Sequence, residues 1–479
     1  MPATPRQPLE NDNKETLVSQ HSAQSVHQYV HHPAETPKKQ TACLHPLADF
    51  PRERISMALS HPSPGHGPSR RSALGFMSAV PLAAGGLLAS QETAEANADL
   101  SSGSGRIPKD LRPGGAFDRH IKELADKDQF SGTVMIAYRG RQVLARAYGW
   151  ADKEGRIPNK IDTIYALASS SKPFTGLAVV QLAQQGKLKF YDLVSKHLDG
   201  LPAEMAERIT VHHLLTHTSG LGDARRPGEN PPPEQIHNSY EQQMADFWAN
   251  LKTFQLEFAP GTKKAYSSMG YTLLGELVAK VSGTSFQDYV RQNIFLPAGM
   301  EDSAYYDRRR WLTDKRIAHP YMHQKDGTRV DAVRNLDKGS VYGDAGQGSN
   351  SARGWMGTGG GNGFATAPDL VRFAIALQGG KLTTRPYTEL YVNGKISAKP
   401  LKEDTSGNSL RGEGFQAYGP VAATFNNQRI ITHGGGAGGI STSWSIYLDM
   451  SWTAVILSNY DLQSIEPIID LERRLITGA

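Results

Sequence analysis

The hydrophobic pattern predicts strands towards both ends of the folded region and helices between them. Runs rich in β-forming residues occupy 132–152, 428–436, 441–449 and 452–460, and such runs are typical of strands. Arg139-Gly140 predicts a hairpin turn inside the first run, and residues 449–451 predict a tight turn between the last two.

Helical spacing of apolar residues predicts helices with recognisable ends. An amphipathic helix is expected at 117–126, and an apolar helix is expected to begin at the serines of "SSSKPF" and to end at Gly186. Two more are expected from cap and stop residues. They are 366–378, with Thr366 as N-cap and Gly379-Gly380 as stop, and 465–476, with Ser464 as N-cap.

These elements predict a single α+β domain at 99–479. An antiparallel sheet made from both chain ends, with flanking helices, would receive a helical subdomain at approximately 188–380. Pro- and Gly-rich breaks at 227–233 and 337–363 interrupt that subdomain. The run "GTGGGNGF" at 357–364 lacks the Gly-Lys-Ser/Thr of a phosphate-binding loop, so it is interpreted as a loop leading into the next helix.

The first 98 residues are expected to lie outside the folded domain. Residues 1–68 lack apolar periodicity and are interpreted as a disordered or mis-called leader, with Met57 as a candidate start. In 69–98 an Arg pair precedes a short apolar run and small residues at Ala94, Ala96 and Ala98, which indicates a twin-arginine-type signal and an exported, periplasmic or secreted protein. A Pro/Gly/Ala-rich linker is the alternative, and the run is too short for a stable membrane span.

Composition narrows the chemistry. The chain has 38% hydrophobic residues, 48 Gly and 28 Pro, which is typical of a soluble, loop-rich globular protein. The net charge of +5 is mild and no Lys/Arg cluster marks a nucleic-acid surface. Cys43 is the single cysteine and no His-Glu-x-x-His is present, so neither a metal nor another cofactor is expected. Oligomeric state is left open.

In the segment "LASSSKPF" three consecutive serines precede one lysine, and each serine is a candidate nucleophile. Residues three apart in a helix share a face, whereas residues one or two apart do not, so Ser169 alone faces Lys172. A serine needs such a base to become a nucleophile. The alternative is a capping serine beside a surface lysine.

Two later stretches, "FAPGTKKAYSSMGYTLLGELV" and "ITHGGGAGGIS", supply the context for this pair. With Ser169-Ser-Ser-Lys172, Tyr266-Ser-Ser268 and His433-Gly-Gly435 in this order, the sequence resembles the serine β-lactamase and penicillin-binding-protein superfamily. It is nearest the class C branch, which includes family VIII carboxylesterases and D-stereospecific peptidases. The flanks "ITVHHLLTHTSGL", "PAGMEDS" and "TAPDLVRF" also fit, from about residue 115 to the C-terminus.

The resemblance implies the roles of the site residues. Ser169 would be acylated, and Lys172 and Tyr266 would share the acid and base work, with the starting base left open. The backbone N–H groups of Ser169 and Gly436 would form the oxyanion hole. Substrate-binding residues would be Ser268, His433, Gly434 and Gly435.

Ser268 departs from the family pattern, which has asparagine there. Serine is shorter and carries no amide, so turnover of β-lactams is in doubt, and a carboxylesterase-like hydrolase acting on small esters or amides is favoured. β-Lactamase or D-peptidase (DD-carboxypeptidase-like) activity remains an alternative, as does a slowly acylating penicillin-binding sensor. An α/β-hydrolase is excluded, because its G-x-S-x-G elbow is absent.

Overall fold

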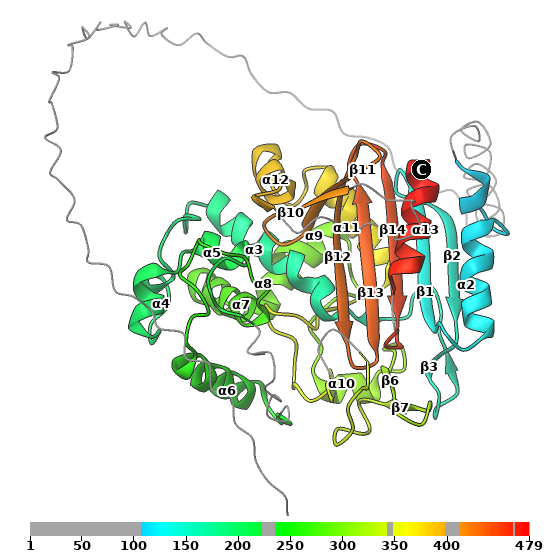
Figure 1. The fold of residues 1–479 in the computed structure, drawn as a ribbon, viewed down its shortest axis with the longest axis horizontal. Helices are drawn as coiled ribbons and strands as arrows, with labels where there is room; N and C mark the ends of the chain where they lie inside the picture. The colour runs from blue at the N-terminus through cyan, green and yellow to red at the C-terminus, as the bar shows by residue number, and fades with distance from the viewer. Residues whose placement is uncertain (1–106, 223–234, 343–347, 398–411, 463–464, 479) are drawn as a thin grey trace, which may run out of the picture. The chain divides into compact units, whose positions relative to one another are not determined.

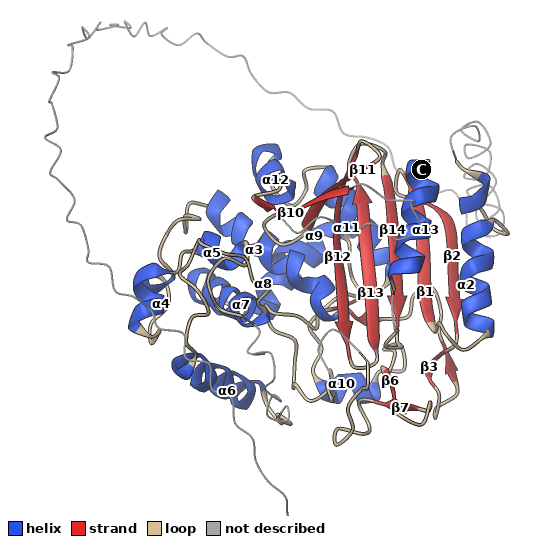
Figure 2. Cartoon of the chain, viewed as in Figure 1, coloured by secondary structure: helices blue, strands red, loops and turns tan. Residues whose placement is uncertain are grey.

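An eight-stranded antiparallel sheet forms the centre of the computed structural model (Figures 1 and 2). The structure describes residues 107–222, 235–342, 348–397, 412–462 and 465–478, all within one unit of the chain, 84–479. The predicted leader, the signal segment and Ser464 lie outside the described residues. The strand order is β2 (Arg141–Tyr148), β1 (Gly132–Tyr138), β14 (Trp452–Ser458), β13 (Ile440–Tyr447), β12 (Gln428–Ala437), β11 (Val421–Phe425), β10 (Gly412–Gln416) and β9 (Ile396–Ser397).

The predicted joining of the two chain ends is confirmed. Strand β1 pairs with β14 from Gly132 opposite Ser458 to Tyr138 opposite Trp452. Arg139 (φ 50°) and Gly140 (φ 75°) form the two-residue turn into β2, and positive φ at both positions matches the twist of a hairpin. Strands β9 to β11 were not predicted.

Both faces of the sheet are buried, so the fold has three layers. Because side chains alternate along a strand, Val134 and Ile136 of β1 join a cluster on one face, while Met135 and Ala137 join the larger core on the other. Helices α2 (Ala116–Asp126) and α13 (Glu466–Thr477) cover the first face through residues such as Phe117 and Ile469. The predicted helices at 117–126 and 465–476 are therefore confirmed to within one residue.

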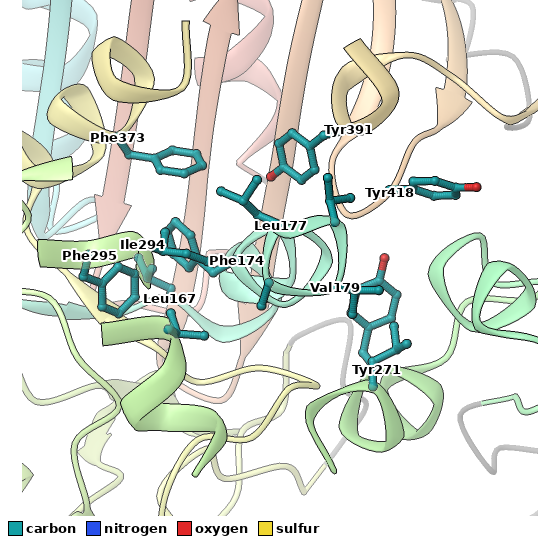
Figure 3. Close-up of a cluster of buried hydrophobic side chains, with 14 of the residues drawn as sticks. Leu167, Phe174, Leu177, Val179, Tyr271, Ile294, Phe295, Phe373, Tyr391 and Tyr418 are labelled. Atoms are coloured by element: carbon teal, nitrogen blue, oxygen red, sulfur yellow. The ribbon is translucent and has the colours of Figure 1, made fainter. Parts of the chain in front are cut away.

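Helix α3 (Lys172–Gln184) runs through the core on the opposite face. It is buried on all sides from Lys172 to Ala183 and is mostly apolar, as expected of a helix inside a core. Figure 3 shows Phe174 in the cluster with Phe295 and Phe373, whose rings meet it edge-on at centroid distances of 4.9 and 5.0 Å. Gly186 (φ 71°) follows the helix, as predicted. This packing fixes the first turn of α3, where the serines lie.

The remaining described elements are mostly helices between β5 and β9. Helix α11 (Ala367–Gln378) has the predicted Thr366 cap, whose side chain accepts the Asp369 N–H. The other helices are η1 (Lys109–Leu111), η2 (Ala168–Ser171), η3 (Val194–Lys196), α4 (Ala203–Arg208), α5 (Val211–Leu215), α6 (Tyr240–Thr253), α7 (Ser268–Ser282), α8 (Phe286–Val290), η4 (Arg291–Phe295), α9 (Leu296–Ala298), α10 (Arg308–Thr313) and α12 (Arg385–Val392). Three strand pairs complete the fold: β3 (Trp150–Asp152) with β4 (Ile157–Pro158), β5 (Tyr165–Ala166) with β8 (Phe364–Ala365), and β6 (Tyr321–His323) with β7 (Arg329–Asp331).

Over the residues that the structure describes, no helix combines the length and the apolar character needed to cross a membrane.

Candidate active site

The short helical turn η2 gives its three serines three different surroundings. Ser170 and Ser171 are fully buried: the Ser170 hydroxyl donates to the His433 carbonyl (3.1 Å), and the Ser171 hydroxyl donates to the Ala168 carbonyl (2.8 Å). Ser169 is only partly buried and lines a cavity. Of the three, Ser169 is therefore the one whose hydroxyl faces open space.

The backbone before Ser169 is held in an unusual conformation. Ala168 has φ 46°, in the left-handed region that non-glycine residues rarely adopt. Its carbonyl accepts the Asn362 N–H at 3.0 Å as well as the Ser171 hydroxyl. Such strain persists only where neighbouring contacts enforce it, and it is frequent at functional sites.

Lys172 is fully buried and lies against Ser169. Its Nζ lies 2.9 Å from the Ser169 hydroxyl, 3.2 Å from the Ser268 hydroxyl and 2.6 Å from the Gly360 carbonyl. A carbonyl can only accept, whereas a hydroxyl can donate or accept. The contacts therefore suit an ammonium with three donors, and equally a neutral amine whose lone pair accepts the Ser169 O–H.

The ring of Tyr266, and not its hydroxyl, contacts the Lys172 amine. Lys172 Nζ is 4.7 Å from the Tyr266 ring centroid, and Tyr266 is 42% exposed. Within the described part of the chain, no hydrogen bond joins its hydroxyl to Ser169 or Lys172. Catalytic hydrogen bonds often form only once substrate is bound.

Strand β12 forms the opposite wall. The His433 side chain is buried, and its Nδ1 donates to the Gly434 carbonyl at 2.6 Å. Burial and the nearby Lys172 lower the pKa of His433 to about 4, so the ring is neutral at neutral pH. Gly436 lines the same cavity as Ser169.

Gly434 and Gly435 differ in what their missing side chains allow. A Cβ on Gly435 would overlap the Leu167 carbonyl oxygen, so glycine lets the strand pack against η2. Gly434 is exposed, and the nearest atom to a Cβ there is the Thr442 carbonyl oxygen at 3.8 Å. Gly435, which was predicted to bind substrate, lies against the turn that carries the serines.

The cavity beside Ser169 has a volume of about 440 Å³ and a largely uncharged wall. Among its described lining residues, Arg353 is the one with a permanent charge. Its guanidinium donates to the carbonyls of Leu336 (2.9 Å), Gly348 (2.8 Å) and Lys338 (3.0 Å). Other lining residues are Gln235, His237, Gln243, Ser268, Thr272, Ser349, Asn350, Met356, Asn362 and Ala437.

Outside the serine site, one cluster of described residues has the side-chain types that bind metal ions. Asp152, His319 and Asp331 place a ligand atom each within 4.8 Å of one another. The Arg334 guanidinium already bonds both carboxylates, at 2.8 Å to Asp152, and lies 3.1 Å from His319 Nδ1. A cation of the protein itself neutralises this cluster, so the residues do not fit a metal ion.

Sequence reasoning missed two parts of the site. The stretch 357–364 was predicted as a loop leading into the next helix, but Phe364 begins strand β8, and the Gly360 carbonyl in this loop binds Lys172. A run of three glycines was the available signal, because glycine permits close backbone approach. His217 was quoted only as part of a flanking phrase, yet it is buried against Tyr266.

Comparisons with known proteins show which family of sequences this chain resembles. The family model described as Beta-lactamase matches residues 117–475. Penicillin-binding protein 4* of Bacillus subtilis (strain 168) is 30% identical over 345 residues, which are 71% of this chain and 70% of that protein.

Two solved structures have the same fold. A penicillin binding protein from Bacillus halodurans has a TM-score of 0.60 and 25% identity, covering 74% of this chain and 99% of its own. EstCE1, "a hydrolase with promiscuous acyltransferase activity", has a TM-score of 0.58 and 19% identity, covering 76% of this chain and 97% of its own.

Proposed function

Because the chain belongs to the β-lactamase family and is a serine hydrolase, we propose that it cleaves small esters through an acyl-enzyme on Ser169. Its fold is the β-lactamase/transpeptidase-like α+β fold. The observation that carries the proposal is the contact of 2.9 Å between Lys172 Nζ and the Ser169 hydroxyl at the wall of the cavity.

Acylation begins when Ser169 Oγ attacks the carbonyl carbon of the substrate. The hydroxyl proton passes to the base, Lys172 Nζ directly or the Tyr266 oxygen. Negative charge develops on the carbonyl oxygen, and the backbone N–H groups of Ser169 and Gly436 would stabilise it. The intermediate then expels the alcohol, which takes the proton from the same acid. Water attacks the acyl group in the second half, and Ser169 is released with the carboxylic acid product.

The identity of the base follows the protonation of Lys172. If the Lys172 amine is neutral, its lone pair accepts the Ser169 O–H, and its two N–H groups donate to the Gly360 carbonyl and the Ser268 hydroxyl. If it is an ammonium, it stabilises a tyrosinate and Tyr266 takes the proton. Both routes require Lys172, and the second also requires a hydrogen bond between the Tyr266 hydroxyl and Ser169 that forms once substrate is bound.

An uncharged substrate suits this cavity better than a β-lactam or a peptide with a carboxylate. His433, which stands where the family has a lysine or a histidine, is neutral because its pKa is lowered to about 4. Gly434 offers no hydroxyl, and the Arg353 guanidinium is bonded to backbone carbonyls. A substrate carboxylate would therefore lose hydration, while the permanent cation on the described wall, Arg353, already donates to three backbone carbonyls.

The second candidate is the amide chemistry of the relatives. The Bacillus subtilis relative is a penicillin-binding protein, and Ser268 still contacts Lys172 at 3.2 Å although it is shorter than asparagine. β-Lactamase, D-peptidase or sensor activity would each begin with the same acylation of Ser169 and would differ in the release step.

The test compares turnover of a p-nitrophenyl ester and of a chromogenic cephalosporin by the purified protein. We expect sustained ester turnover that Ser169→Ala abolishes and that Ser170→Ala, the control on the same turn, retains in part. Faster turnover of the cephalosporin than of the ester would contradict the proposed preference for esters. A single stoichiometric burst without further product would favour the sensor.

Export belongs to the proposal as well. Residues 69–98 have the order of a twin-arginine-type signal. N-terminal sequencing of protein recovered from the periplasm or the medium should begin close to residue 98. A mature protein that still carries residues upstream of 90 would contradict cleavage there.

A further inference from the structure

His217 holds the segment that carries Tyr266 at three successive residues. Its carbonyl accepts the Ala265 N–H at 3.0 Å, its Nδ1 accepts the Ser267 N–H at 3.1 Å, and its ring lies against the Tyr266 ring at a centroid distance of 4.6 Å. The structure shows no comparable set of contacts from another described residue to these three positions.

A second aromatic residue, Tyr271, packs against the His217 ring. The two rings are stacked at 4.8 Å and 29°, so Tyr266, His217 and Tyr271 form one stack beside Lys172. The Tyr271 hydroxyl donates to the Leu215 carbonyl at 2.8 Å, which ties the stack to helix α5. Figure 3 shows Tyr271 at the border of the core around α3. The stack therefore connects the exposed Tyr266 ring to the rigid interior.

The His217 ring is a neutral imidazole with its proton on Nε2. Because Nδ1 accepts a backbone N–H, the ring proton sits on Nε2. Nε2 is buried and has no partner among the described residues. Burial, together with Lys172, His433 and Lys264, lowers the pKa of His217 well below its usual range. The ring is thus neutral and adds no charge next to Lys172.

The backbone of His217 is adapted to this place. Its φ of 57° lies in the left-handed region, which histidine and asparagine adopt more readily than most residues. The turn after α5 directs the ring into the stack, and the next residues, Thr218 and Ser219, are buried beside it. A strained, buried and incompletely bonded residue at this point is hard to explain by packing alone.

We propose that His217 is a positioning residue, which keeps the Tyr266 ring over Lys172 so that the tyrosine hydroxyl can exchange a proton with the Ser169 site. This inference rests on the proposed function, because it assigns a task to a residue that acts through Tyr266. It predicts that the effect of changing His217 depends on the tyrosine hydroxyl.

The experiment measures the rate at which a fluorophosphonate labels Ser169. His217→Asn keeps an acceptor for the Ser267 N–H and suits a positive φ, but it removes the stacked ring. Loss of one such ring contact is expected to slow labelling about three- to tenfold. In a Tyr266→Phe background the same change should slow labelling by less than about twofold, because there is no hydroxyl left to position. Circular dichroism and thermal unfolding accompany each variant.

The outcomes separate the two proposals. Equal slowing of labelling in both backgrounds, or no slowing in the wild-type background, overturns the inference while wild-type labelling of Ser169 upholds the serine nucleophile. Absence of labelling at Ser169 in the folded wild-type protein overturns both. If His217→Asn does not fold, His217→Gln is used in the same cycle, and failure of both variants to fold overturns a positioning role in favour of a purely structural one.

Discussion

Neutral His433 in a buried strand makes a quantitative prediction for acid stability. In the unfolded chain this histidine titrates near its ordinary pKa of 6.5, whereas burial and Lys172 lower the pKa to about 4 in the folded protein. Between these values the unfolded state binds more protons, so the free energy of unfolding falls as the pH falls. The full difference is about 3 kcal/mol, since one pKa unit corresponds to about 1.4 kcal/mol.

The stabilising contribution is complete above about pH 6.5 and is lost as the pH falls through about 4. Roughly 2 kcal/mol of it should disappear between about pH 7.5 and about pH 5. Glu472, whose pKa burial raises to about 7, titrates in the same range with the opposite sign. A comparison with a variant at His433 removes such contributions, because they are common to both proteins.

The assay is urea unfolding of wild type and of His433→Asn at both pH values. Asparagine keeps an N–H donor for the Gly434 carbonyl but does not titrate. The loss of stability on acidification should be about 2 kcal/mol smaller in the variant. Thr432→Val, on the same strand and also buried, should change stability equally at both pH values. Equal acid sensitivity of wild type and His433→Asn would refute a buried, neutral histidine.

Three further predictions follow from the same geometry. Lys172→Met should lower ester turnover by about 100- to 10,000-fold, since both routes need the lysine, whereas the exposed Lys187→Met should not; equal turnover would exclude Lys172 from catalysis. Gly435→Ala should cost about 1–3 kcal/mol in urea unfolding, because the Cβ would overlap the Leu167 carbonyl, and Gly434→Ala should stay within about 0.5 kcal/mol; the reverse order would contradict the packing of β12 on η2. Ser268→Asn should raise the ratio of cephalosporin to ester acylation about two- to tenfold by supplying an amide hydrogen bond, and an unchanged ratio in stopped-flow traces would remove Ser268 from substrate selection.

The spacing of neighbouring residues in the sequence predicted much of the fold and the Ser169–Lys172 pair of the site. Helical geometry singled out Ser169 from its neighbours, and the turn and cap residues located the hairpin at Arg139 and the helix after Thr366. These features depend on a few adjacent residues, so the sequence contains them directly. Strand β9 was missed because it has two residues, and β10 and β11 because they are short and contain two Gly and two Ala residues, respectively. Their pairing partners define these strands more than their own propensity does.

The unpredicted parts of the site depend on contacts between distant segments. The Gly360 carbonyl reaches Lys172 across 188 positions of sequence, and the neutral state of His433 depends on burial beside that same lysine. His217 stood in a recognisable phrase, but only the folded chain shows that three of its groups hold the Tyr266 segment.

The most direct test of the account is the position of the covalent acyl group. The protein is mixed with a p-nitrophenyl ester, quenched in acid during turnover, and mapped by fragmentation of its peptides. The acyl mass should lie on Ser169, the partly exposed serine bonded to Lys172. An acyl group on Ser170 or Ser171, or sustained turnover with unmodified Ser169 throughout, would contradict the proposed nucleophile.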